Sequence, residues 1–563
     1  MTTIIPGYLF SISLPSFSGK FQSNKKCCNA GLSFRRSKGA TQAIEDSCPL
    51  GFSPGTKPAN DDHLLTSKTS YLSLMKKCIT VLATFAVITA GAQHYEANWQ
   101  SLNTRGIPSW FREAKFGIFI HWGVYAVPSY APVLENSGVS YAEWYWYRIN
   151  EGNKYFKTFH EKNYGSNFQY PQFESQFTAS MFDPTAWSSV FKRSGAKYVV
   201  LTSKHHEGYC LWNSAEADRD WGHPWNAVTG TPHRDLLGDL TNAVREAGLK
   251  MGYYYSLYEW FNPLWQKDKP RFVTEHMIPQ FKDLVSRYKP SVIFSDGEWE
   301  LTDTQWRSPE LLAWLFNESP VAKEVVVDDR WGSNTREKNN GCTYATSEYG
   351  SGMSANVVWE ENRGIGHSYG YNRNEGLDDY KSSHDLILML ADVVSRGGNL
   401  LLDIGPTADG RIPVIMQQRL IDIGDWLANN GEAIYGTQPW KQSYQWSKGN
   451  LPQKKDKSFM AGYDVAQLVK PKQNEAYIEY FFTRKDGDLY CIVPRFTAKI
   501  RIHNLIIGPT TKATVLGNNS QSPAGKTFIC KRSGNDCVID LSQAKPGEIP
   551  AELFVVKLTG VVK

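Results

Sequence analysis

Charged and hydrogen-bonding residues stand at the ends of several apolar runs in this 563-residue chain. The segment SVIFSDGEWE at residues 291–300 ends its apolar run in Asp296 and Gly297, a pair that also favours a turn. Other runs end in His121; Lys204, His205 and His206; Tyr255 and Glu259; Asp328, Asp329 and Arg330; and Asp403. One such residue would indicate only a cap or a turn. Their convergence predicts a site for a polar small molecule, with Asp296 as a catalytic carboxylate.

Two kinds of chemistry fit these residue types. Glycoside hydrolysis needs a pair of carboxyl groups, and aromatic rings can stack on sugars. The 19 Trp, 29 Tyr and 27 Phe residues supply such rings, although a large core also uses them. A metal site is the other candidate, but His205 and His206 are adjacent and cannot easily face one point from a strand. We therefore expect neither a metal nor another cofactor.

Helix and strand signals alternate from about residue 93 to residue 440. Helices are predicted at 184–194, 234–248, 277–288 and 383–396, and Asp183 with Pro184 marks the start of the first. The strands between them are nearly continuous runs of Val, Ile, Leu and Tyr, which is typical of parallel strands buried on both faces. This pattern predicts an α/β fold, a (β/α) TIM-like barrel, whose active site lies at the carboxyl ends of the strands.

The pattern of predicted elements changes at about residue 441, from alternating helices and strands to short strands alone. The stretch AYIEYFFTRKDGDLYCIV reads as two strands around a Lys-Asp-Gly turn, and further short strands follow. We predict a C-terminal all-β sandwich over residues 441–563. Cys530 and Cys537 are the best candidates for a disulfide there.

The N-terminal residues resemble processing signals rather than a packed domain. Residues 1–74 are rich in Ser, Gly and Lys and are predicted to be an unstructured upstream extension, or the result of a misplaced start codon. Residues 75–92 combine two lysines, a short apolar stretch and Ala-Gly-Ala, as in a secretory signal peptide. The mature chain is expected to be secreted or periplasmic, or lysosomal in an animal-like host, with no membrane insertion after cleavage. The net charge of +5, without a long basic run, does not favour nucleic acid.

Eight motifs in order resemble those of the α-L-fucosidases of glycoside hydrolase family 29. They are FGIFIHWGVYAVPSY, AEWYWYRI, LTSKHHEGYCLW, YYYSLYEWFNP, FSDGEWE, DDRWG, YGYNRNE and GGNLLLDIGPTADGRI. The resemblance implies a cofactor-free, exo-acting, retaining hydrolase that removes terminal α-linked L-fucose from a fucosylated oligosaccharide or polysaccharide. A homo-oligomer is compatible with it.

The same resemblance assigns roles to individual residues. Asp296 matches the nucleophile, and Glu360 of the Trp359-Glu360 pair is the expected acid/base, with Glu361 as the alternative. Sugar-binding roles fall on His121, Glu143, Trp144, His205, His206, Tyr255, Arg330 and Tyr369. Tyr255 matches the strand tyrosine of the family, with Tyr253 and Tyr254 as its neighbours. Phe294 and Tyr369 stand where relatives often have other aromatic residues, so the packing against the sugar is expected to differ.

Two other functions stay open on the sequence. A non-catalytic, lectin-like protein could use the same barrel to bind fucose. A metal-dependent hydrolase could use His205, His206 and Asp296.

Overall fold

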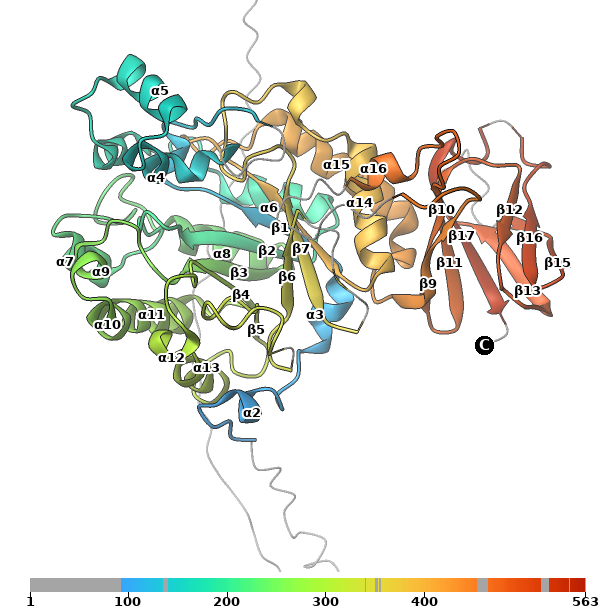
Figure 1. Ribbon diagram of the computed structural model, residues 1–563, viewed down its shortest axis with the longest axis horizontal. Coiled ribbons are helices and arrows are strands. Elements are labelled where there is room, and N and C mark those ends of the chain that lie inside the picture. The colour runs from blue at the N-terminus through green and yellow to red at the C-terminus, as the bar shows by residue number, and fades with distance from the viewer. Residues whose placement is uncertain are drawn as a thin grey trace, which may run out of the picture. The chain divides into compact units, whose positions relative to one another are not determined.

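A computed structural model describes residues 93–561, apart from 135–139, 340, 350–352, 354–355, 453–463, 518–525 and 546. Eight parallel strands form one curled sheet in the order β5-β4-β3-β2-β1-β8-β7-β6 (Figure 1). Their bounds are β1 Phe116–Ile120, β2 Tyr198–Lys204, β3 Lys250–Ser256, β4 Val292–Asp296, β5 Val326–Val327, β6 Ala345–Glu348, β7 Trp359–Gly364 and β8 Asn399–Ile404. A parallel bridge between Val327 and Thr343 joins the two edges of the sheet. The predicted TIM-like barrel is confirmed.

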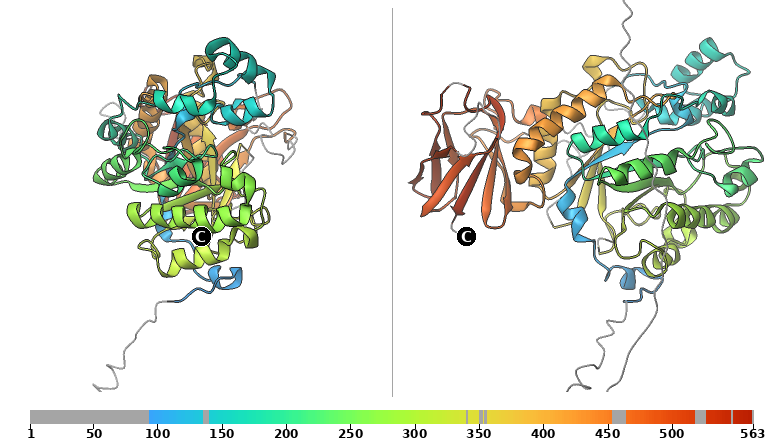
Figure 2. Two further views of the ribbon diagram at one scale, coloured as in Figure 1. Left: turned by 90° about the vertical axis from the view of Figure 1, so that its left-hand side faces the viewer. Right: turned by 180° about the vertical axis from the view of Figure 1, so that it is seen from behind.

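Helices cover the outside of the strands, as both views in Figure 2 show. The main ones are α6 Pro184–Arg193, α8 Leu236–Glu246, α11 Ile278–Tyr288, α13 Ser308–Asn317, α14 Ser383–Ser395 and α15 Val414–Asn430. Asp183 caps α6 by accepting hydrogen bonds from the backbone of Thr185 and Ala186, as its sequence predicts. The described residues between β5 and β7 contain no helix, which is a departure from strict strand–helix alternation.

The interior of the barrel is filled by side chains at the amino ends of the strands. The ring of Phe111, from the short helix α3 Ser109–Ala114, packs 4.5 Å from Tyr344 and 5.7 Å from Tyr198. Val200, Val292 and Val326 belong to the same buried cluster. This packing closes the amino end, so a cavity can form only toward the carboxyl ends.

Antiparallel strands follow the barrel and form two sheets. The larger has the order β14-β13-β17-β11-β10-β9, and the smaller has the order β12-β16-β15. Their bounds are β9 Gln438–Trp446, β10 Ile478–Lys485, β11 Asp488–Arg495, β12 Lys499–Ile502, β13 Ile507–Val515, β14 Thr527–Phe528, β15 Cys530–Ser533, β16 Asp536–Asp540 and β17 Glu552–Val561. Asp486 and Gly487, both at positive φ, make the turn between β10 and β11 that the Lys-Asp-Gly motif predicts.

The two sheets share a hydrophobic core, as expected for a sandwich. Phe482 and Val493 of the larger sheet pack in one cluster with Ile500 and Ile539 of the smaller sheet. Phe481, which alternates with Phe482 along β10, belongs instead to the cluster that includes the barrel helices. The larger sheet is therefore buried on both faces.

The predicted extension and signal peptide, residues 1–92, lie outside the described residues. Among the residues that the structure does describe, no helix is both long and apolar enough to cross a bilayer. The cysteines from Cys210 onward, including Cys530 and Cys537, are free thiols in this structure.

Candidate active site

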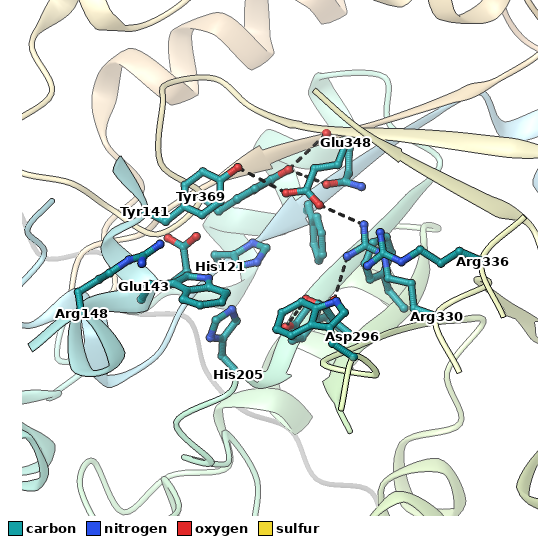
Figure 3. A pocket seen from close by; sticks show the side chains of 16 residues that line it. His121, Tyr141, Glu143, Arg148, His205, Asp296, Arg330, Arg336, Glu348 and Tyr369 are labelled. Carbon is teal, nitrogen blue, oxygen red and sulfur yellow. Dashed lines mark hydrogen bonds and ion pairs between the residues drawn. The ribbon is translucent and has the colours of Figure 1, made fainter. Parts of the chain in front are cut away.

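A cavity of about 440 Å³ opens at the carboxyl ends of the barrel strands (Figure 3). The predicted residues His121, Glu143, Trp144, His205, Phe294, Asp296, Arg330 and Tyr369 line it. So do Phe119, Tyr141, Arg148, Tyr254, Trp299, Arg336, Glu348 and Asn362, which the sequence did not single out as site residues. A pocket of this size, with aromatic walls and a few converging polar groups, suits a small polar ligand.

Asp296 is the last residue of β4, and its carboxylate is held from two sides. Nη1 of Arg330 donates to Oδ1 at 2.9 Å, and the hydroxyl of Tyr254 donates to Oδ2 at 2.9 Å. Nε2 of His206 lies 3.6 Å from Oδ2. Burial acts to raise the pKa of Asp296, but the charge of Arg330 and these other neighbours outweigh it and leave the pKa lowered. Asp296 is therefore ionised at neutral pH.

Gly297 allows the chain to turn directly after Asp296. Its φ is +73°, and a Cβ there would lie 2.4 Å from the ring of Tyr258, so neither the conformation nor the space admits a side chain. The turn read from the sequence is thus real. It presents Asp296 at the pocket while the chain leaves the barrel.

Arg330 connects Asp296 to a second carboxylate, that of Glu348. Its Nη2 lies 3.2 Å from Oε2 of Glu348 (Figure 3). Its Nε donates to Thr346 at 3.1 Å. Its guanidinium also lies 4.9 Å from the centre of the Phe294 ring. Glu348 ends β6, so both carboxylates are strand-end groups held by one buried guanidinium.

Histidines form the wall on the other side of the pocket. Nδ1 of His121 lies 2.7 Å from Oδ1 of Asp403, so Nε2 is the nitrogen that His121 can offer to a ligand. Burial lowers the pKa of His121 and raises that of Asp403, which favours a pair without net charge. His205 stacks on Tyr254 with ring centres 5.4 Å apart. His206 does not line the cavity; its Nδ1 bonds to Ser256 at 2.7 Å.

Glu143, Trp144 and Tyr369 complete the predicted set. Glu143 accepts from the backbone N–H of Gly370 at 2.9 Å, and burial raises the pKa of its carboxyl. The ring of Trp144 lies 6.0 Å from that of Trp299, which is 40% exposed. Tyr369 donates to Oδ1 of Asn362 at 2.6 Å, which fixes its ring at the pocket wall.

The structure does not bring Glu360 or Glu361 to this pocket. Glu360 is the second residue of β7, near the amino end of the barrel, where it is fully buried and accepts a hydrogen bond from Tyr198. Burial raises the pKa of its carboxyl to about 8. Glu361 faces the opposite side of the strand and pairs with Arg363 at 2.6 Å. Neither position suits the expected acid/base, because the pocket-lining residue of β7 is Asn362, which lies two residues beyond Glu360 and in register with Glu348 of β6.

Tyr255 is also placed away from the pocket, and its neighbour Tyr254 takes the expected position. Tyr254 pairs in register with Phe294, and both point into the barrel. Tyr255 points outward and donates to Gln280 at 2.8 Å. The alternation of side chains along β3 places Tyr254 inside and Tyr255 outside, and three consecutive tyrosines carry no local signal that separates them.

Glu348 is a pocket residue that the sequence analysis missed. It ends a strand, as the other site residues do, but β6 reads Ala-Thr-Ser-Glu and has no apolar run to mark it. Arg148, Arg336 and Trp299 lie in connecting segments or short helices, where strand-end reasoning gives no signal.

Known proteins resemble this chain over most of its length. The family model described as "Alpha-L-fucosidase" matches residues 82–432. The chain belongs to the α-L-fucosidase family. It is 37% identical to the alpha-L-fucosidase of Dictyostelium discoideum over 481 residues, which are 84% of this chain and 96% of that protein. It is 38% identical to the human tissue alpha-L-fucosidase over 480 residues, 83% of this chain and 92% of that protein.

Solved structures of α-L-fucosidases share this fold. The Thermotoga maritima alpha-fucosidase in complex with a mechanism based inhibitor is 33% identical, with a TM-score of 0.66 over 83% of this chain and 100% of that chain. The same enzyme in complex with fucose is 32% identical, with a TM-score of 0.65 over 83% and 100% of the two chains. The chain is therefore a glycoside hydrolase.

In the part of the chain that the structure describes, no group of three or more His, Cys, Asp or Glu side chains is arranged to hold a metal ion.

Proposed function

We propose that this protein is an exo-acting, retaining α-L-fucosidase with Asp296 as nucleophile and Glu348 as acid/base. The observation that carries the proposal is that Arg330 contacts both carboxyl groups. Its Nη1 lies 2.9 Å from Oδ1 of Asp296, and its Nη2 lies 3.2 Å from Oε2 of Glu348. A retaining enzyme needs two carboxyl groups about 5–5.5 Å apart, and an inverting enzyme needs about 6.5–9.5 Å to admit a water. Two carboxylates on one guanidinium favour the shorter spacing.

The first step joins the sugar to Asp296. The ionised carboxylate attacks the anomeric carbon, and the bond from that carbon to the leaving oxygen breaks. Glu348, which enters this step as the protonated carboxyl group, donates its proton to that oxygen, so the aglycone leaves as an alcohol. Arg330 and Tyr254 hold Asp296 in place by its two oxygens.

The second step releases the sugar. Glu348, now ionised, takes a proton from water, which attacks the same carbon and breaks its bond to Asp296. The configuration is inverted twice and so is retained. Glu348 is protonated again, and Asp296 is free.

The rest of the pocket suits a single deoxy sugar. His121, Glu143 and His205 offer hydrogen-bonding groups for hydroxyls, while Phe119, Phe294 and Tyr369 form an apolar wall suited to the fucose methyl group. The structure of the Thermotoga maritima relative with fucose supports this choice of sugar. The substrate is then a fucosylated oligosaccharide or polysaccharide. Because residues 75–92 resemble a secretory signal peptide, the proposal includes secretion of the mature enzyme.

Proton NMR during hydrolysis of an aryl α-L-fucoside tests the mechanism. A retaining enzyme first releases the α-anomer of L-fucose, which later equilibrates with the β-anomer. Initial appearance of the β-anomer would contradict double displacement. Absence of turnover would instead favour a fucose-binding protein.

A further inference from the structure

A second hollow lies on the C-terminal sandwich, outside the catalytic barrel. It measures about 700 Å³ and is lined in part by Trp446, Tyr477, Glu479, Arg501, His503 and Asp536. Trp446 ends β9, Tyr477 precedes β10, and Arg501 lies on β12 of the smaller sheet. The hollow thus spans the edges of both sheets, and its volume is within the range of ligand pockets, about 300–1,000 Å³.

Two aromatic residues, Trp446 and Tyr477, lie at one side of this hollow. Trp446 and Tyr477 are both half-buried, and hydrogen bonds join the backbone of Ser447 to Tyr477 at 2.8 Å and of Tyr477 to the Ser447 hydroxyl at 3.0 Å. The ring of Trp446 packs edge-on against Tyr444 at 5.5 Å. An aromatic side chain has only two torsions to fix, so it loses little entropy when a ligand packs on it.

Paired polar groups lie on the rest of the hollow's lining. Asp536 accepts from Arg501 at 3.1 Å, from His503 at 3.0 Å and from the backbone of Asn504 at 3.2 Å. Oε2 of Glu479 accepts from Gln445 at 2.8 Å, and Gln445 also accepts from the backbone of His503 at 2.9 Å. These bonds join the edges of the two sheets and fix the polar groups before any ligand arrives.

The charges in this hollow nearly balance. Glu479 and Asp536 oppose Arg501 and the neighbouring Lys448. A strongly anionic ligand would have to compete with Asp536 for Arg501, and a cationic one would meet Arg501 and Lys448. Planar polar groups beside aromatic rings match an uncharged sugar, whose hydroxyls need both donors and acceptors and whose C–H faces pack on rings.

From this arrangement we infer that the sandwich carries a second, non-catalytic saccharide site for neutral sugar residues. The site rests on its own geometry and extends the proposed function, because it would hold a large glycan while the barrel cleaves its terminal fucose. A small aryl fucoside does not need it.

Affinity electrophoresis of the full chain tests the inference. The Asp296→Asn variant is run in native gels containing a neutral fucosylated xyloglucan, so that the probe is not cleaved. Tyr477→Ala and Arg501→Ala, each added to Asp296→Asn, are expected to weaken binding roughly 5- to 20-fold, the loss of about one stacking or charge-assisted contact. Phe496→Ala is the matched control, because Phe496 is an aromatic residue of the sandwich that is 41% exposed and does not line the hollow.

Kinetic and control measurements complete the test of the second site. With Asp296 intact, Tyr477→Ala and Arg501→Ala should leave kcat/KM on an aryl α-L-fucoside unchanged. Equal retardation of all variants, or no retardation of the parent, would overturn the second site. If the wild-type chain does not cleave the aryl fucoside, the proposed function fails, while the gel result still stands on its own.

Discussion

Nη1 of Arg330 lies 2.9 Å from Oδ1 of Asp296, and both side chains are almost fully buried. A buried carboxylate is costly unless it is paired, and a buried guanidinium has the same requirement. Nη2 of Arg330 also lies 3.2 Å from Oε2 of Glu348, so one guanidinium pairs with two acidic side chains. The Arg330 guanidinium therefore keeps Asp296 ionised and also holds Asp296 close to the carboxyl group of Glu348.

The first prediction concerns Asp296 itself. Asp296→Gly should lower kcat on an aryl α-L-fucoside by roughly 10³-fold or more, because no covalent intermediate can form. Azide can occupy the space of the lost carboxylate, so it should restore turnover and give β-L-fucosyl azide. Steady-state kinetics and NMR of the azide product check this. A variant that keeps wild-type activity would remove Asp296 from the mechanism.

The second prediction separates Glu348 from Glu360 and Glu361. Glu348→Gln should lower kcat by about 10²- to 10⁴-fold on substrates with poor leaving groups, because general acid catalysis is lost. The loss should be smaller with a dinitrophenyl leaving group, which needs little proton donation. Glu360→Gln and Glu361→Gln should stay close to wild type on both substrates.

Azide sharpens the test of Glu348. In Glu348→Gln, azide should attack the intermediate on Asp296 in place of activated water and give α-L-fucosyl azide. The same product from Glu360→Gln, together with a leaving-group-dependent loss, would return the acid/base role to Glu360.

Most strands and helices of the barrel, and half of the residues that line the pocket, could be predicted from the sequence. Apolar runs and capping signals such as Asp183 locate strands and helices, because burial and capping are local requirements. Residues at or just beyond strand ends, such as Asp296 and Arg330, then converge because parallel strands share one carboxyl end. These inferences needed only local sequence and the barrel geometry.

The missed residues depend on information that lies elsewhere in the fold. Whether Tyr254 or Tyr255 faces the pocket depends on the register of β3 against β4, which three consecutive tyrosines cannot reveal. The depth of Glu360 depends on where β7 begins relative to its neighbours, since Glu360, four residues before the end of β7, lies in the packed interior. Glu348 follows a short polar strand, so its local sequence resembles a loop.

A third prediction follows from the hydrogen bond of Tyr254 to Asp296 at 2.9 Å. That bond favours the carboxylate and contributes to the lowered pKa of Asp296. Tyr254→Phe removes the bond, so the pKa of Asp296 should rise and the acidic limb of kcat/KM should move to higher pH by about one unit. The pH dependence of kcat/KM on an aryl fucoside measures the shift.

Tyr255→Phe is the matched control for Tyr254→Phe. It removes the same hydroxyl from the adjacent residue, but that hydroxyl bonds to Gln280 outside the pocket. Its pH profile should overlay that of the wild type. An equal displacement of both profiles would mean that the tyrosines act through the packing of β3 and not through Asp296.

The last prediction concerns stability and the buried carboxyl of Glu360. Burial raises its pKa from 4.5 to about 8, so the folded state holds this proton over a pH range in which the unfolded state has lost it. Below pH 4.5 both states are protonated and Glu360 adds no pH dependence. As the pH rises toward 8, the free energy of unfolding falls, by on the order of 5 kcal/mol at the limit of linkage.

Glu360→Gln should remove this loss, because an amide does not titrate. Its side-chain oxygen can still accept from Tyr198, and its amide group can donate toward the Tyr344 hydroxyl beside it. Thermal unfolding at pH 5 and pH 9 compares the variant with the wild type, so that other titrating groups cancel. The variant's stability relative to wild type should be higher at pH 9 than at pH 5. Glu361→Gln, which breaks the 2.6 Å pair with Arg363, should lower stability at both pH values. A constant difference between Glu360→Gln and wild type across the range would show that Glu360 does not hold a proton in the folded barrel.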